Sequence, residues 1–213
     1  MKRSFDLSMS SRRQGASTHW FDTYPAVTEL TSNAHQPAVE DPIALIDVAG
    51  GRGHDIVAFS KAYPDLPGKL VREDLPSTFS FLEPDDRQEL LNADVTMQEY
   101  DFLTPQPIKG AHAYFLRDIC HDWPDKQARQ FLGNTAQAMT RGYSKLLIED
   151  HVVDDQEAHY LPAASDVLMM LILTGIERTR QQWIALLDSV ELEIVKIWPG
   201  RRGHQSVIEA MRK

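Results

Sequence analysis

The chain has 213 residues, 42% of them hydrophobic and 25% charged, which suits one globular domain with a small additional segment. Its net charge of −9 argues against nucleic-acid binding, because no excess of Lys and Arg is left to neutralise phosphates. The most apolar stretch, residues 167–176, is about half the ~20 residues that a membrane-spanning helix needs, so we expect no membrane association. The single cysteine, Cys120, excludes an internal disulfide and is typical of a reducing, cytoplasmic compartment.

The first part of the chain differs in pattern from the rest. Residues 1–40 are polar apart from an aromatic cluster, and we expect a helical and linker segment there. Residues 41–213 are predicted to form one domain, because strand-like and helix-like runs then alternate regularly. The predicted strands occupy residues 43–49, 69–74, 111–117 and 145–151. The clearest helix pattern covers residues 125–139, where apolar side chains recur at helical spacing.

The C-terminal part carries a different signal. Residues 192–198 and 205–211 are two strand-like runs joined by a short turn, which predicts a hairpin. Apolar strands that alternate with helices predict a parallel sheet covered on both faces. We therefore predict an α/β fold with a mostly parallel, seven-stranded sheet, helices on both faces and a C-terminal antiparallel hairpin.

A glycine-rich loop, DVAGGRG, follows the first predicted strand. Gly50, Gly51 and Gly53 therefore lie at the edge of the sheet where open α/β folds bind ligands. Asp47 precedes them, and a carboxylate there would repel a pyrophosphate but attract a cationic ligand. Asp74 ends the second strand, where a carboxylate can accept hydrogen bonds from ribose hydroxyls. The pattern favours S-adenosylmethionine over a dinucleotide, with a purely structural glycine turn as the alternative.

Four segments together resemble one known family. IDVAGGRGHD, DFLTPQP, YFLRDICHDWPD and GIERT are similar to motifs of fungal O-methyltransferases of the plant caffeate type. Those enzymes have a Rossmann-like class I methyltransferase domain and use S-adenosylmethionine. The resemblance implies that this chain is their C-terminal catalytic domain without the N-terminal helical domain that dimerises and roofs the active site. We therefore expect a homodimer, or association with another chain that supplies the cover.

The resemblance also implies roles for individual residues. His121 has the position of the catalytic base, and Glu177 and Asp150 have the positions of the acids that support it. The residues implied for the cofactor are Asp47, Gly50, Gly51, Gly53, Asp74, Asp101, Phe102 and Arg117. The residues implied for the small-molecule substrate are Trp20, Met169 and Asp118. No metal is implied, and the spacings typical of zinc sites are absent from the sequence.

These residue types suit methyl transfer to oxygen. A neutral histidine within hydrogen-bond reach can take the proton of a phenol as the new bond forms. A carboxylate behind the imidazole ring fixes its tautomer and stabilises the imidazolium. The predicted activity is therefore O-methyl transfer from S-adenosylmethionine to a hydroxyl group, which we expect to be phenolic, of a secondary metabolite.

Two departures from the family pattern leave other functions open. Ala49 replaces a glycine in the cofactor loop, and Asp150 is one methylene shorter than the family's second supporting glutamate. A second hypothesis is a pericyclase or isomerase that keeps S-adenosylmethionine bound and unreacted, while Arg117, Asp118 and His121 polarise a substrate carbonyl. A third is a non-catalytic partner of a full-length homologue.

Structural explanations also exist for several of these residues. His121 could simply decorate the start of a helix, and Met169 is as compatible with a core as with a pocket. Cys120 is expected to be a buried, inert thiol at the end of an extended strand, where neighbouring side chains point to opposite faces. Arg178 is expected to be a solvated or salt-bridged charge on the surface.

Overall fold

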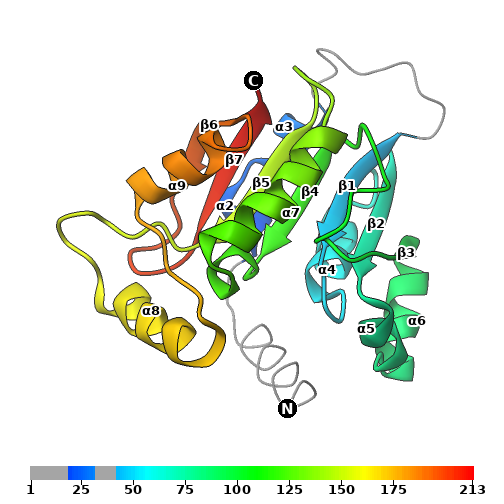
Figure 1. Cartoon of the computed structure of the whole chain (residues 1–213). Coiled ribbons are helices and arrows are strands. Elements are labelled where there is room, and N and C mark those ends of the chain that lie inside the picture. The colour runs from blue at the N-terminus through cyan, green and yellow to red at the C-terminus, as the bar shows by residue number, and fades with distance from the viewer. Residues whose placement is uncertain (1–18, 32–41) are drawn as a thin grey trace.

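The computed structural model describes residues 19–31 and 42–213, and its centre is a seven-stranded sheet (Figure 1). The strand order is β3-β2-β1-β4-β5-β7-β6. The strands are β1 (Ile43–Val48), β2 (Lys69–Asp74), β3 (Val95–Glu99), β4 (Ala113–Arg117), β5 (Lys145–Asp150), β6 (Leu192–Trp198) and β7 (Ser206–Arg212). Strands β1 to β5 pair in parallel, and β7 is antiparallel to β5 and β6. The predicted fold class is confirmed, including the hairpin.

Helices cover both faces of the sheet. They are α2 (Trp20–Thr23), α3 (Ala26–Thr31), α4 (His54–Ala62), α5 (Pro76–Ser80), α6 (Pro84–Asn92), α7 (Asp125–Ala138), α8 (Tyr160–Leu173) and α9 (Arg180–Asp188), with a short 3₁₀ helix η1 (Cys120–Asp122). Helices α7 and α9 contribute to one core cluster. Helices α2, α3 and α4 contribute to a second cluster, which also takes side chains from β1, β4, β5 and β7.

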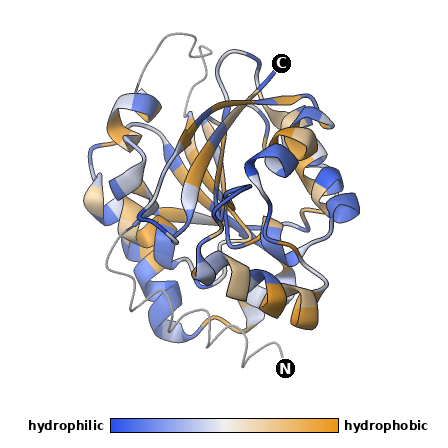
Figure 2. Cartoon of the chain, turned by 90° about the vertical axis from the view of Figure 1, so that its left-hand side faces the viewer, coloured by the Kyte–Doolittle hydropathy of each residue, from blue (hydrophilic) through white to orange (hydrophobic). Residues whose placement is uncertain are grey.

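The helical periodicity of residues 125–139 is explained by the packing of α7. Ala128, Phe131 and Leu132 lie at helical spacing and are fully buried against the sheet. Burying such side chains removes apolar surface from water and stabilises the fold by roughly 1.5–3 kcal/mol for each large residue. Figure 2 shows the corresponding concentration of hydrophobic residues along the strands and mixed colouring on the surrounding helices.

Helix α8 differs from the other long helices, because much of its apolar surface faces solvent. It stands off from the sheet in Figure 1, and the strongly hydrophobic colouring of this segment lies low in Figure 2. Its exposed large hydrophobic residues are Tyr160, Leu161, Val167, Leu168, Met170, Leu171 and Ile172. A contiguous apolar patch of this kind is typical of an interaction surface.

Residues 1–40, strand β3 and the apolar helices are the other features that bear on the sequence predictions. The helical part of residues 1–40 is represented by α2 and α3, whereas the predicted boundary near residue 40 lies outside the described residues. Strand β3 was not located by the sequence patterns, because only its first residue is fully buried. Within residues 19–31 and 42–213, no helix combines the length and the apolarity that crossing a bilayer requires.

Candidate active site

The order of strands reverses between β1 and β4, and the glycine loop lies at the carboxyl end of β1. Open α/β sheets bind their ligands at such a switch point. A Cβ atom on Gly50 would lie 2.4 Å from Oδ2 of Asp47, so only glycine allows this close approach. Gly51 and Gly53 have φ angles of 57° and 83°. Ala49 also has a left-handed φ of 58°, which costs on the order of 1 kcal/mol for a residue with a Cβ.

Asp74 ties the end of β2 to this loop. Its Oδ2 accepts a hydrogen bond from the backbone N–H of Gly51 at 2.8 Å. Its Oδ1 accepts from the backbone N–H of Leu75 and the hydroxyl of Thr78, both at 2.7 Å. The carboxylate is therefore fixed beside the glycine loop, at the carboxyl end of β2.

The other residues implied for the cofactor lie beyond β3 and at the end of β4. Asp101 is exposed, and Phe102 packs edge-on against Trp123 with ring centroids 5.7 Å apart. Arg117 is almost enclosed by carboxylates. Its Nη1 lies 2.5 Å from Oδ1 of Asp55, and its Nε lies 3.0 Å from Oε2 of Glu149. Burial lowers the pKa of Arg117, but these carboxylates outweigh burial and raise it overall.

His121 lies in η1, directly after β4, and four carboxylates surround its ring. On one side, Nδ1 is 2.9 Å from Oε1 of Glu177 and 3.6 Å from Oδ1 of Asp150. On the other side, Nε2 is 3.4 Å from Oδ1 of Asp122 and 4.0 Å from Oδ1 of Asp118. The structure therefore brings together the three residues that the resemblance implies for catalysis, from three separate segments.

The carboxylates raise the proton affinity of the ring. Burial lowers the pKa of His121, but Asp150, Glu177 and Asp118 outweigh it and raise the pKa to about 10. Burial raises the pKa of Asp150 to about 8, against the attraction of His121. Burial also raises the pKa of Glu177, but its hydrogen bond to His121 leaves the pKa below its usual value. At neutral pH the imidazole is therefore an imidazolium that donates to Glu177.

Glu177 is held in place by contacts that the sequence did not reveal. Its Oε1 accepts from the hydroxyl of Ser165 at 2.6 Å, and its backbone N–H donates to Asp166 at 2.8 Å. A Cβ on Gly175 would lie 2.0 Å from the carbonyl oxygen of His121, so this glycine lets the two segments touch. In the sequence, the glycine of the GIERT segment is the one indication of this contact, because a residue without a Cβ lets two backbone segments approach closely.

The expectation that Arg178 is a surface charge is wrong. Its side chain is fully buried, and it donates to the backbone carbonyls of Cys120 and Trp123 at 2.7 and 2.8 Å. It also pairs with Asp125 at 3.0 Å, so the expected salt bridge is present. Arg178 therefore braces the segment that carries His121, because its planar group satisfies several acceptors at once.

The three residues implied for the substrate lie in different surroundings. Trp20 is 1% exposed and stacks on Phe115 with ring centroids 4.6 Å apart, which is a core position. Met169 is buried on α8. Asp118 lies beside His121 with a left-handed φ of 53°, and the side-chain amide of Gln205 donates to its Oδ1.

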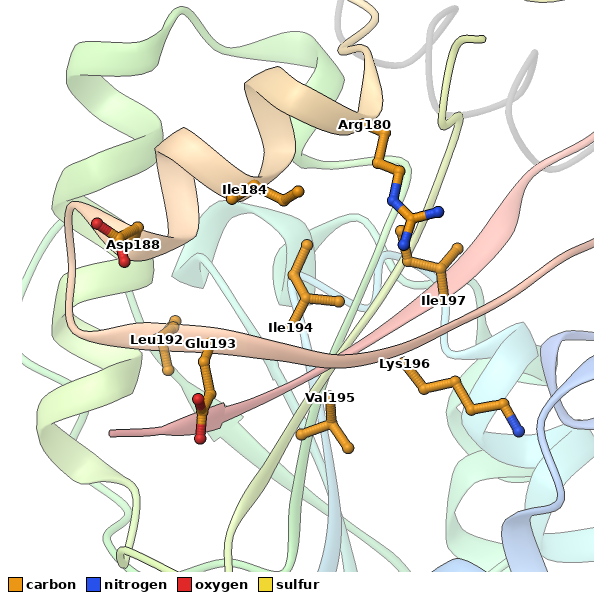
Figure 3. Close-up of a pocket in the computed structure, with 9 residues that line it drawn as sticks. All are labelled: Arg180, Ile184, Asp188, Leu192, Glu193, Ile194, Val195, Lys196 and Ile197. Carbon is orange, nitrogen blue, oxygen red and sulfur yellow. The ribbon is translucent and has the colours of Figure 1, made fainter.

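Cys120 is fully buried, and burial raises the pKa of its thiol, as expected for an inert residue; it lies in a 3₁₀ turn, however, and not on an extended strand. A separate hollow of about 280 Å³ lies between α9 and β6 (Figure 3), with Ile184, Ile194 and Ile197 in its lining. It borders the edge strand of the sheet and contains none of the residues implied for catalysis.

Comparisons with known proteins show the family to which the chain belongs. The family model described as the O-methyltransferase domain matches residues 32–191. The chain is 38% identical over 98% of its length to methyltransferase cfoC of Aspergillus candidus, and 39% identical over its whole length to O-methyltransferase penC of Penicillium thymicola. It covers 50% and 51% of those two proteins, so it spans about half the length of the curated relatives that it matches.

Solved structures give the same result. LepI in complex with SAM superposes with a TM-score of 0.81 at 29% identity, covering 93% of this chain and 49% of that one. OxaC in complex with SAH and oxaline superposes with a TM-score of 0.79 at 33% identity, covering 92% and 48%. The chain belongs to the O-methyltransferase domain family, whose relatives include fungal enzymes of secondary metabolism.

Proposed function

We propose that the chain binds S-adenosylmethionine and transfers a methyl group to a hydroxyl, phenolic in character, of a small secondary metabolite. The observation that carries the proposal is the position of His121 at the end of β4, with Nδ1 held by Glu177 at 2.9 Å. Because Nδ1–H donates to Glu177, Nε2 is the nitrogen that accepts a proton from the acceptor.

The cofactor edge of the sheet fits a cationic ligand. Asp47, Asp74 and Asp101 lie at or just beyond the ends of β1, β2 and β3, and carboxylates favour a positively charged group. Gly50 has no room for a side chain and Gly51 has a left-handed φ, and both glycines allow the backbone to approach the cofactor closely. When bound, S-adenosylmethionine supplies the methyl group. Neighbours solved with SAM or with SAH support this choice of cofactor.

The protein residues supply the proton transfer. A phenol has a pKa near 10 and stays protonated at neutral pH, so it needs a base as its oxygen attacks. The imidazolium of His121 has a pKa of about 10, so the neutral imidazole is a strong base once that proton has been lost. The rate of methyl transfer should therefore rise with pH as His121 becomes neutral, until the free base predominates.

The test is a mass-spectrometric assay with S-adenosylmethionine and a panel of polyhydroxylated aromatic acceptors. We expect the mass gain of one methyl group on an acceptor, lost in His121→Ala while calorimetry shows cofactor affinity unchanged. His112→Gln is the matched control. His112 is also buried, but it precedes the amino end of β4, whereas His121 follows the carboxyl end. Full activity in His121→Ala would contradict the assigned base.

The carboxylates around His121 favour one second candidate. An imidazolium held by four carboxylates is a hydrogen-bond donor, and a donor polarises a substrate carbonyl without any methyl transfer. A solved neighbour with a TM-score of 0.81 and 29% identity is described as a pericyclic reaction enzyme. This function predicts isomerisation without a change in mass, at a rate that falls as pH rises towards 10. The sign of the pH dependence thus separates the two candidates.

A further inference from the structure

Arg72 is a fully buried arginine beneath the cofactor loop, and sequence analysis did not single it out. Its Nη2 donates to the backbone carbonyl of Gly51 and lies 3.6 Å from Oδ2 of Asp74. The same Oδ2 accepts from the backbone N–H of Gly51 at 2.8 Å. Both backbone polar groups of Gly51 therefore contact the Arg72–Asp74 pair: its carbonyl accepts from Arg72, and its N–H donates to Asp74.

The rest of the guanidinium is poorly satisfied. Among the residues that the structure describes, Nε and Nη1 of Arg72 are buried without any hydrogen-bond partner. The group stacks on the ring of Phe79, 4.4 Å from its centroid. Burying a charge with unmade hydrogen bonds destabilises a fold, and apolar residues of similar volume at such positions are often neutral or stabilising. Fold stability therefore does not account for an arginine here, whereas its contacts with the loop do.

The loop has a reason to need this support. Ala49 adopts a left-handed φ of 58°, which a residue with a Cβ rarely adopts, so other loop conformations compete with the observed one. Within the loop, Nε of Arg52 donates to Oδ2 of Asp86 at 2.6 Å. Arg72 holds the carbonyl of Gly51, two residues after the strained Ala49.

We propose that Arg72 is a positioning residue that holds the cofactor loop in its binding conformation and offsets the strain introduced by Ala49. It acts through Gly51 and Asp74 and does not itself touch the cofactor. The inference rests on the proposed binding of S-adenosylmethionine at this loop. It predicts that the effects of substituting Arg72 and Ala49 on cofactor affinity are coupled.

The experiment is a double-mutant cycle of Arg72→Met and Ala49→Gly, read by calorimetric titration with S-adenosylmethionine and by thermal unfolding. We expect Arg72→Met to weaken binding about 10-fold, the effect of losing a charge-assisted hydrogen bond, while the melting temperature stays unchanged or rises. Adding Ala49→Gly should restore about 5-fold of that loss, because it removes the left-handed strain of roughly 1 kcal/mol. In the wild-type background, Ala49→Gly should change the affinity less than about 2-fold, because Arg72 already holds the loop.

Lys145→Met is the matched control, because Lys145 is another buried cation, paired with Glu209 at 2.8 Å, at the start of β5 away from the loop. We expect it to lower the melting temperature and leave cofactor affinity unchanged. Equal effects of Ala49→Gly in both backgrounds would overturn the proposal, as would a parallel loss of affinity and melting temperature in Arg72→Met.

The two proposals can fail separately. If the unaltered chain does not bind S-adenosylmethionine, the proposed function fails at the cofactor step. The role of Arg72 is then decided by amide hydrogen exchange of residues 49–53 in the free protein. Faster exchange in Arg72→Met than in Lys145→Met would support the positioning role, and equal exchange would refute it.

Discussion

The proton affinity of His121 is set by the carboxylates around it, and Asp150 is the one to change first. Asp150→Asn removes the carboxylate whose charge alone raises the pKa of His121 most, and the amide keeps the size of the side chain. At the observed 3.6 Å, two unit charges interact by roughly 4–5 kcal/mol at an effective dielectric constant of about 20, or about 3 pKa units. The pKa of Asp150 is raised only to about 8, so its carboxylate is ionised when the ring titrates near pH 10 and its charge acts on the imidazolium. We therefore expect a fall of up to about 3 units in the pKa of His121.

The assay is a pH titration of the histidine side chains by long-range ¹H–¹⁵N NMR, with the His121 signal assigned by its loss in His121→Gln. His112 is an internal reference, because its ring stacks on Tyr143 away from the site and should titrate identically in both proteins. Asp154→Asn, a change at an exposed carboxylate in the next loop, should leave His121 unaffected. A wild-type His121 that titrates near 6.5, or a titration that Asp150→Asn does not move, would refute the reasoning.

Three further predictions concern stability and association. The pKa values of His121 (about 10) and Asp150 (about 8) in the folded chain both lie above their values in the unfolded chain, so the folded state holds protons that the unfolded state releases. The free energy of unfolding, measured with urea, should therefore fall from pH 6.5 to pH 10. His121→Gln should make this fall smaller. Arg178→Met should cost roughly 2–3 kcal/mol in the same assay, since two buried backbone carbonyls lose their donor, and a loss within 0.5 kcal/mol would contradict its bracing role. Leu171→Glu, on the exposed face of α8, should shift any self-associated chain towards the monomer in analytical ultracentrifugation while the melting temperature is unchanged; an unaltered distribution would exclude this face as the contact.

The sheet could be predicted from the sequence because its strands carry their own signal. Residues 43–48 are apolar apart from Asp47, residues 146–148 form an apolar centre in β5, and both strands are buried, as expected for strands covered on both faces. The hairpin follows from two strand-like runs around a short turn. Strand β3 has no such run. It is polar and half-exposed at the edge of the sheet, so periodicity could not separate it from a loop.

The candidate site could be predicted only in part, because its contacts join distant segments. The glycine loop and Asp74 follow from local sequence and topology. The pair of His121 and Glu177 spans 56 residues, and only the family resemblance implied it. Arg72 and Arg178 could not be found from sequence at all, since charged residues are normally exposed and nothing local indicates that these two are buried.

The surroundings of His121 contain more negative charge than a histidine base requires. One carboxylate on Nδ1 is enough to fix the tautomer, and Glu177 does this at 2.9 Å. Asp118, Asp122 and Asp150 add no hydrogen bond to that ring within the described residues, yet Asp118 and Asp150 contribute to its raised pKa. Proton removal from an acceptor is favoured when this ring is neutral, and polarisation of a carbonyl is favoured when it is charged. The carboxylates around His121 therefore make its protonation state the property that separates the two proposed activities.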